Sequence, residues 1–104
     1  MVKVFIIGRK HRTNALGEYN PESKEIVLKR GSVVSEDVAE FSHKESIMKL
    51  REEIVDSKGE LKKDRVFSNA TAAAQFVCGY SVSGPIAWHV EKHITLAAWL
   101  KENQ

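Results

Sequence analysis

An alanine-rich stretch between Asn69 and Gly79 constrains the fold of this chain more than any other part of its sequence. Asn69 is a good N-cap residue, because its side-chain oxygen accepts from the first free amides of a helix, and Gly79 is a favoured stop. The residues between them therefore predict a helix. Ala72 and Ala73 lie on the same side as Phe76, and small side chains there allow close approach to a sheet or to another helix. We expect this helix to pack closely in the core.

The length and composition indicate one ordinary globular core. A chain of 104 residues can bury a core without disulfides or a metal, but it is too short for two ordinary domains. The apolar run at residues 4–7 is far short of a membrane span, and no leader pattern follows Met1, so we expect no membrane association. The single cysteine, Cys78, lies in an apolar helical run, which predicts a buried thiol and a reducing, cytoplasmic location.

Five segments have the pattern of strands. Residues 2–7 are β-branched and aromatic and are followed by Gly8. Residues 16–19 and 25–29 flank a turn-rich tetrapeptide at 20–23, which predicts a hairpin. Residues 65–67 are expected to form a short strand. After the turn at residues 83–85, apolar and polar side chains alternate from Ile86 to Glu91, which predicts a strand with Trp88 on its buried face.

Two further helices are predicted. Ser42 and Glu45 have the spacing of a capping box, so a helix should begin at Ser42 and run to Gly59, with Ile47 and Ile54 on its apolar face. Thr95 can cap a last helix that runs through residue 100. This order of elements predicts an α+β fold in a single domain over residues 1–104, with a small antiparallel sheet and about three helices packed on it.

A set of motifs spans most of the chain, and its spacing holds without gaps from Phe67 to Trp88. It comprises Gly17, Tyr19, Ile26, Val27, Leu28, Gly31, Ser32, Phe67, Asn69, Ala70, Thr71, Ala72, Ala73, Ala74, Gly79, Ser83, Gly84, Trp88, Thr95 and Leu96. On these residues the chain resembles domain-of-unknown-function 4357, with a family-like core at residues 15–99. It is also distantly similar to the RAMA domain of restriction enzymes and adenine methylases, and that resemblance implies recognition of modified DNA.

The chain departs from the family pattern at three positions. Ala70 stands where proline is common, which costs little in the first turn of a helix. Ser83 replaces an asparagine, and Pro85 replaces the first tryptophan of the pattern. If those two side chains contact a ligand in relatives, this chain has lost part of that site.

Three basic clusters and one turn are the candidate binding site. Phosphate contacts need Lys or Arg, and hydroxyl groups or backbone amides can add donors. The candidate residues are Arg9, Lys10, Arg12, Lys29, Arg30, Ser32, Lys62, Lys63, Arg65, Ser83 and Gly84. Residues 1–30 carry seven Lys or Arg against three Glu, whereas residues 31–60 carry four against eight Asp or Glu. The alternative is a set of solvated surface charges, which such runs form on most proteins.

Other candidate groups have simpler interpretations. Trp88 and Trp99 can stack on a base, but Trp88 shares a predicted strand face with apolar residues and Trp99 can dock the last helix, so core packing is favoured. His89 and His93 are four residues apart, which on a strand puts them roughly 13 Å apart, too far to share a metal. Metal binding is not expected.

The sequence contains no catalytic or cofactor motif, such as a Gly-rich phosphate loop, a nucleophile elbow or a metal-spaced cysteine pair. We therefore expect neither enzymatic activity nor a cofactor. The leading hypothesis is a non-catalytic module that contacts DNA or RNA through basic loops, including modified DNA as the resemblance implies. The alternative is a protein-interaction or structural adaptor domain that binds a protein partner or self-associates. A continuous positive face favours the first, and scattered charge with an exposed apolar patch favours the second.

Overall fold

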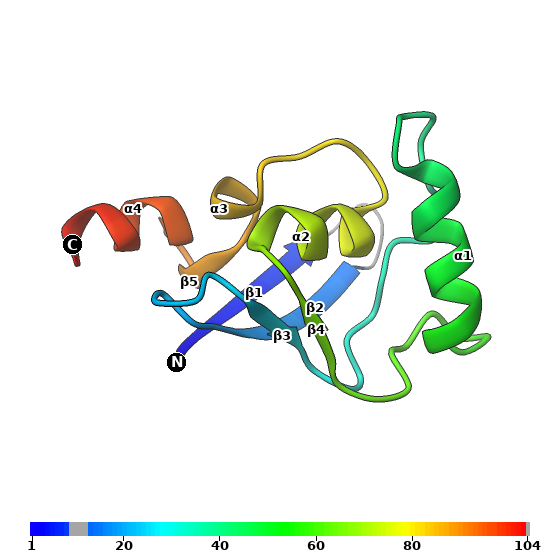
Figure 1. Cartoon of the computed structure of the whole chain (residues 1–104), viewed down its shortest axis with the longest axis horizontal. Coiled ribbons are helices and arrows are strands. Elements are labelled where there is room, and N and C mark those ends of the chain that lie inside the picture. Colours follow the sequence, from blue (N-terminus) through cyan, green and yellow to red (C-terminus); the bar gives the residue numbers. More distant parts are fainter. Residues whose placement is uncertain (9–12, 104) are drawn as a thin grey trace.

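The chain folds around one antiparallel sheet, with the second and third helices over one face and the first and last helices to either side of them (Figure 1). The computed structural model describes residues 1–8 and 13–103, and within them the sheet has six strands in the order β4-β3-β2-β1-β5-β6. The strands are β1 (Val2–Gly8), β2 (Thr13–Tyr19), β3 (Ile26–Leu28), β4 (Arg65–Phe67), β5 (His89–Glu91) and β6 (Ile94–Thr95). The helices of the same residues are α1 (Lys44–Ile54), α2 (Ala70–Cys78), α3 (Gly84–Ala87) and α4 (Leu96–Glu102). The predicted α+β class is confirmed.

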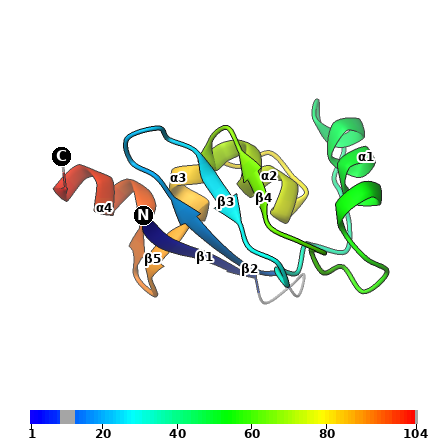
Figure 2. The same ribbon diagram turned by 60° about the horizontal axis from the view of Figure 1, so that its bottom comes forward.

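The sheet has one face packed on helices and one open face. Along β2, Thr13, Ala15 and Gly17 are buried, whereas Asn14 and Leu16 between them are exposed. This alternation follows from the period of two in a strand. Figure 2 shows the strands in front of α2 and α3, with no helix over the face that is turned to the viewer. The predicted hairpin is confirmed, because β2 pairs with β3 across residues 20–25.

Helix α2 is the centre of the helical layer and begins and ends where the sequence predicts. The side chain of Asn69 accepts a hydrogen bond of 2.8 Å from the backbone N–H of Ala72. Gly79 ends the helix in the left-handed conformation, at φ 77°. Ala73 and Ala74 are fully buried, and Cys78 is buried as expected. The small side chains therefore serve close packing.

Helix α1 differs from the sequence prediction at both ends. It begins at Lys44 after His43, which makes no side-chain cap, because a turn closed by the Lys44 N–H and the Phe41 carbonyl occupies the expected first residues. The predicted Ser42 capping box is therefore wrong. The helix ends at Ile54, not at Gly59, because Val55 is extended and bridges Leu61.

The segment after Ser83 also differs from the prediction. Residues Gly84–Ala87 form the one-turn helix α3, not the start of a strand, and β5 is confined to His89–Glu91. Pro85 lies in the first turn of α3, where its fixed φ favours a helix. Gly84 packs so closely on α2 that an added Cβ would lie 2.3 Å from the carbonyl carbon of Ala70. Because of this helical turn, Ile86 is exposed while Trp88 is fully buried.

The C-terminal part of the chain completes the core. The indole N–H of Trp88 donates to the Ala70 carbonyl at 3.0 Å, so the predicted core role of Trp88 is confirmed. The Thr95 hydroxyl accepts from the Ala98 N–H at 3.1 Å, as the predicted cap requires, and Trp99 packs half-buried against the core. In residues 1–8 and 13–103 no helix is both long and apolar enough to cross a membrane.

Candidate nucleic-acid interface

The sheet topology brings the flanks of all three basic segments to one end of the sheet, here called the basic end. Gly8 and Thr13, which flank residues 9–12 in the sequence, pair with each other at this end. Leu28 pairs with Arg65, which places residues 29–30 beside the start of β4. The clusters Lys29-Arg30 and Lys62-Lys63-Arg65, more than thirty residues apart in sequence, therefore lie together. Arg9, Lys10 and Arg12 lie outside the described residues.

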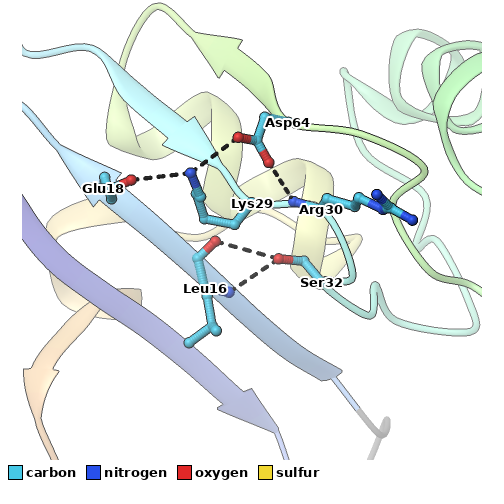
Figure 3. A network of polar contacts seen from close by, with 6 residues as sticks. All are labelled: Leu16, Glu18, Lys29, Arg30, Ser32 and Asp64. Carbon is cyan, nitrogen blue, oxygen red and sulfur yellow. Dashed lines mark hydrogen bonds and ion pairs between the residues drawn. The ribbon is translucent and has the colours of Figure 1, made fainter.

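Asp64 joins two of these segments through both of its carboxylate oxygens (Figure 3). One oxygen accepts the backbone N–H of Arg30 at 2.8 Å, and the other pairs with the Lys29 ammonium at 3.0 Å. Lys29 also pairs with Glu18 at 3.1 Å. The hydrogen bonds from Arg30 and Lys29 hold the pKa of Asp64 below its usual value, and those to Asp64 and Glu18 raise the pKa of Lys29. The charge of Lys29 is therefore compensated within the protein.

Four cations of the basic end remain in solvent. Arg30, Lys62, Lys63 and Arg65 are exposed, and none forms an ion pair in the part of the chain that the structure describes. Their backbone is fixed, because the carboxylate of Asp64 holds one segment against the other and the Gly31 N–H donates to the Leu61 carbonyl at 2.9 Å. This arrangement can present guanidinium and ammonium groups to an anionic surface from two rigid turns.

Acidic residues border the same end of the sheet. Asp56 and Glu60 line a depression of about 340 Å³ together with Arg30 and Lys62. The backbone N–H groups of Glu60 and Lys58 donate to the Asp56 carboxylate and hold its pKa below the usual value. Asp56 is thus engaged in its own turn, and the basic end carries charges of both signs.

Ser32 lies at the basic end but points into the structure. It is buried, and its hydroxyl accepts from the Leu16 N–H at 3.1 Å and donates to the Leu16 carbonyl at 3.3 Å (Figure 3). Both hydrogen-bonding capacities of the hydroxyl are used to join the turn after β3 to β2. Ser32 therefore positions this turn and offers no donor at the surface.

Ser83 and Gly84 belong to a different part of the molecule from the basic end. Gly84 is buried and donates its backbone N–H to the Thr71 hydroxyl at 3.0 Å. Ser83 is exposed, and its carbonyl accepts from the first turn of α3. Figure 1 shows α3 in the helical layer on the α4 side of α2, while the turns that leave β3 and enter β4 lie toward α1. The structure does not bring this turn together with the three basic segments.

The open face of the sheet is a feature that the sequence analysis missed. Ile7, Leu16 and Val66 are 65%, 58% and 54% exposed there, and Phe5 and Val27 are half-buried beside them. The pairing of β1 with β2 and β5 sets Leu16, Phe5 and His89 in one row across three strands. The Phe5 and His89 rings are stacked, with centroids 6.0 Å apart. Both alternating sets of side chains along β1 are largely apolar, so the sequence does not reveal which face of the sheet is open.

A second hollow lies between α1 and α2. Its volume is about 380 Å³ and its floor contains Phe67 and Phe76, with His43, Asn69 and Gln75 among the polar groups at its rim. The Asn69 oxygen is engaged in capping α2, and the Gln75 amide donates to the Val82 carbonyl at 3.3 Å. Most of the polar capacity of this groove therefore serves the fold.

Arg51 is a partly buried cation that holds backbone carbonyls together, a role that its sequence position did not reveal. Its guanidinium donates to the carbonyls of Phe76, Val77 and Ser35, and its carbon lies 5.7 Å from the centre of the Phe76 ring. Burial lowers the pKa of Arg51 to about 10. The side chain is directed into the protein and is not part of a charged binding surface.

The described residues contain no group of three His, Cys, Asp or Glu side chains placed to hold a metal ion. His89 is half-buried with its Nδ1 3.0 Å from the Ala87 carbonyl oxygen, and His93 is exposed in the turn between β5 and β6. Burial raises the pKa of the Cys78 thiol, which disfavours the reactive thiolate.

Comparison with known proteins gives one family. The model of a domain of unknown function (DUF4357) matches residues 5–100, which is nearly the whole chain. The match covers the motif set that runs from Gly17 to Leu96. No curated protein and no solved structure matches the chain.

Proposed function

This chain belongs to the DUF4357 family of domains of unknown function, and we propose that it is a non-catalytic module that binds nucleic acid through its basic end. The observation that supports the proposal is the convergence of segments that are distant in sequence. Pairing of β3 with β4 sets Arg30 beside Lys62 and Lys63, and the β1–β2 connection at the same end carries three further Lys or Arg in its sequence.

The chemistry of this end suits phosphate contacts. Exposed guanidinium and ammonium groups on fixed turns neutralise backbone phosphates and release counterions, which gives affinity without sequence specificity. The interleaved carboxylates of Asp56 and Glu60 limit that affinity, so we expect weak binding at physiological salt and tighter binding at low salt. The free, buried Cys78 supports a location in the reducing cytoplasm.

Recognition of modified DNA rests on the distant RAMA resemblance, and we retain it as the finer form of the proposal. The turn that departs from the family pattern, Ser83 to Pro85, is packed on α2 through Gly84. A comparison of methylated with unmethylated duplexes of one sequence tests this form separately.

A protein-interaction module is the second candidate, because the open face exposes apolar side chains. Ile7, Leu16 and Val66 are more than half exposed on this face, and exposed apolar side chains gathered on one face mark interaction sites in soluble proteins. Sedimentation velocity over a range of concentrations tests self-association directly.

The test of the main proposal is fluorescence anisotropy of labelled DNA and RNA at two salt concentrations. The double variant Lys62→Gln, Lys63→Gln should weaken binding and lower the slope of log affinity against log salt, by roughly 0.7 to 0.9 for each phosphate that the variant no longer neutralises. The matched control is Lys49→Gln, Lys101→Gln, which removes the same charge from exposed positions on α1 and α4. Equal effects of the two double variants, or no binding by the unaltered protein in low salt, would contradict the proposal.

A further inference from the structure

The open face of the sheet adjoins the basic end through Leu16. The Leu16 carbonyl accepts the Lys29 N–H at 2.9 Å, and its backbone also bonds the Ser32 hydroxyl. Figure 3 shows Leu16 directly beside the turn that carries Lys29 and Arg30. The row His89, Phe5, Leu16 therefore crosses three strands of the open face and leads to the basic end.

This row has the chemistry of a platform for bases. Bases stack on aromatic side chains and cover apolar ones, and such contacts are largely independent of sequence. Phe5 is half-buried and shares its face with the His89 ring, while Leu16 is 58% exposed. Figure 2 shows no helix over the face of the sheet that is turned to the viewer, and the exposure of Leu16 places this row on that open face.

The charges past the Leu16 end of the row complement a phosphate backbone. Arg30, Lys62 and Lys63 lie past the Leu16 side, whereas the uncharged Thr95 of β6 is the next residue past His89. The negative charge of Glu18, which lies two residues along β2 from Leu16, is paired with Lys29. An aromatic and apolar row that leads to a cationic end fits a strand whose bases face the sheet and whose phosphates lie at the basic end.

We propose that the ligand of this chain is single-stranded nucleic acid, with bases placed over Phe5 and Leu16 and phosphates at the basic end. This inference rests on the proposed function and specifies its ligand. A duplex keeps the faces of its bases stacked inside the helix, so the Phe5–Leu16 row would have no partner there. The described part of this face is a sheet surface, without the helix or two-stranded ribbon that enters a major groove.

The experiment compares a labelled single strand with the duplex formed from it, by anisotropy in low salt. Phe5→Leu and Leu16→Gln are the test variants, and Ile86→Gln is the control, because Ile86 is also 58% exposed but lies on α3 in the helical layer. We expect the single strand to bind more tightly than the duplex. Phe5→Leu should weaken single-strand binding by roughly fivefold to a hundredfold, with Ile86→Gln unchanged.

The outcomes separate this inference from the proposed function. The inference would be overturned if the single strand and the duplex bound equally well and only Lys62→Gln, Lys63→Gln weakened binding. The open-face variants would then have no effect, and the proposed function would still stand. Absence of all nucleic-acid binding would overturn both. If Leu16→Gln instead converts a dimer to a monomer without affecting binding, the face is a contact between copies and the inference is wrong. Circular dichroism confirms that each variant is folded, and amide-shift changes at Phe5 and Leu16 in the unaltered protein provide a readout that needs no substitution.

Discussion

The guanidinium of Arg51 donates a hydrogen bond of 2.7 Å to the backbone carbonyl of Phe76. The last carbonyls of a helix have no partner within the helix, and here a side chain of α1 supplies one for α2. The same guanidinium reaches the carbonyl and hydroxyl of Ser35, so it ties the loop before α1 to the end of α2. This contact fixes a peripheral helix onto the core.

Replacing Arg51 by Met should lower the free energy of unfolding by about 2 kcal/mol, because it removes charged hydrogen bonds to partly buried carbonyls that would remain unpaired. Arg51→Lys keeps the charge but not the fork of donors, so its effect should be smaller. Urea unfolding followed by circular dichroism measures both. A loss below about 0.5 kcal/mol for Arg51→Met would show that water replaces the guanidinium at little cost.

Gly84→Ala should be among the most damaging small substitutions. The added Cβ would lie 2.3 Å from backbone atoms of Ala70 and Thr71, which cannot yield without moving α2. We expect a loss of about 3 kcal/mol. The control is Gly31→Ala, where φ is 88° but the space around the added atom is empty, so only the left-handed strain of roughly 1 kcal/mol applies. The midpoint temperature of thermal unfolding should be clearly lower for Gly84→Ala than for Gly31→Ala. The reverse order would refute the packing argument.

Two helix starts give a paired prediction about capping. Asn69→Ala removes the acceptor for the Ala72 N–H and should cost about 1 kcal/mol. Ser42→Ala should have almost no effect, because Ser42 lies outside α1 and makes no cap bond to it. Chemical denaturation distinguishes the two. A comparable loss of stability in Ser42→Ala would show that Ser42 caps α1 after all, contrary to the structure.

The parts of the fold that the sequence predicted are those decided by neighbouring residues. Asn69 and Gly79 act on amides and carbonyls within one turn, and the hairpin depends on residues 20–23. By contrast, α3 forms where Gly84 meets a helix fourteen residues earlier, and that long-range contact overrides the alternation that predicted a strand. Local propensity is a weak prior wherever tertiary packing competes with it.

The candidate site follows the same rule. The types of residue in the basic clusters were readable in the sequence, but their convergence depends on the pairing of Leu28 with Arg65. From the sequence alone, Lys29 is one more positive charge that could contact phosphate. In the fold, its ammonium group forms ion pairs with Glu18 and Asp64. The open face was not predictable, because in residues 2–7 both alternating sets are largely apolar and only the packing of the helices in the fold decides which set is covered.

The carboxylate of Asp64 should make stability depend on acid pH. Its pKa lies below the ordinary value of 3.8 because the N–H of Arg30 and the ammonium of Lys29 bond the ionised form. The folded state therefore binds this proton more weakly than the unfolded state, so the stabilisation is present above about pH 4 and is lost as pH falls through the folded pKa. Asp64→Asn should flatten this part of the profile of unfolding free energy against pH. Glu102→Gln, at an exposed position on α4, is the control, and an unchanged slope for Asp64→Asn would exclude the linkage.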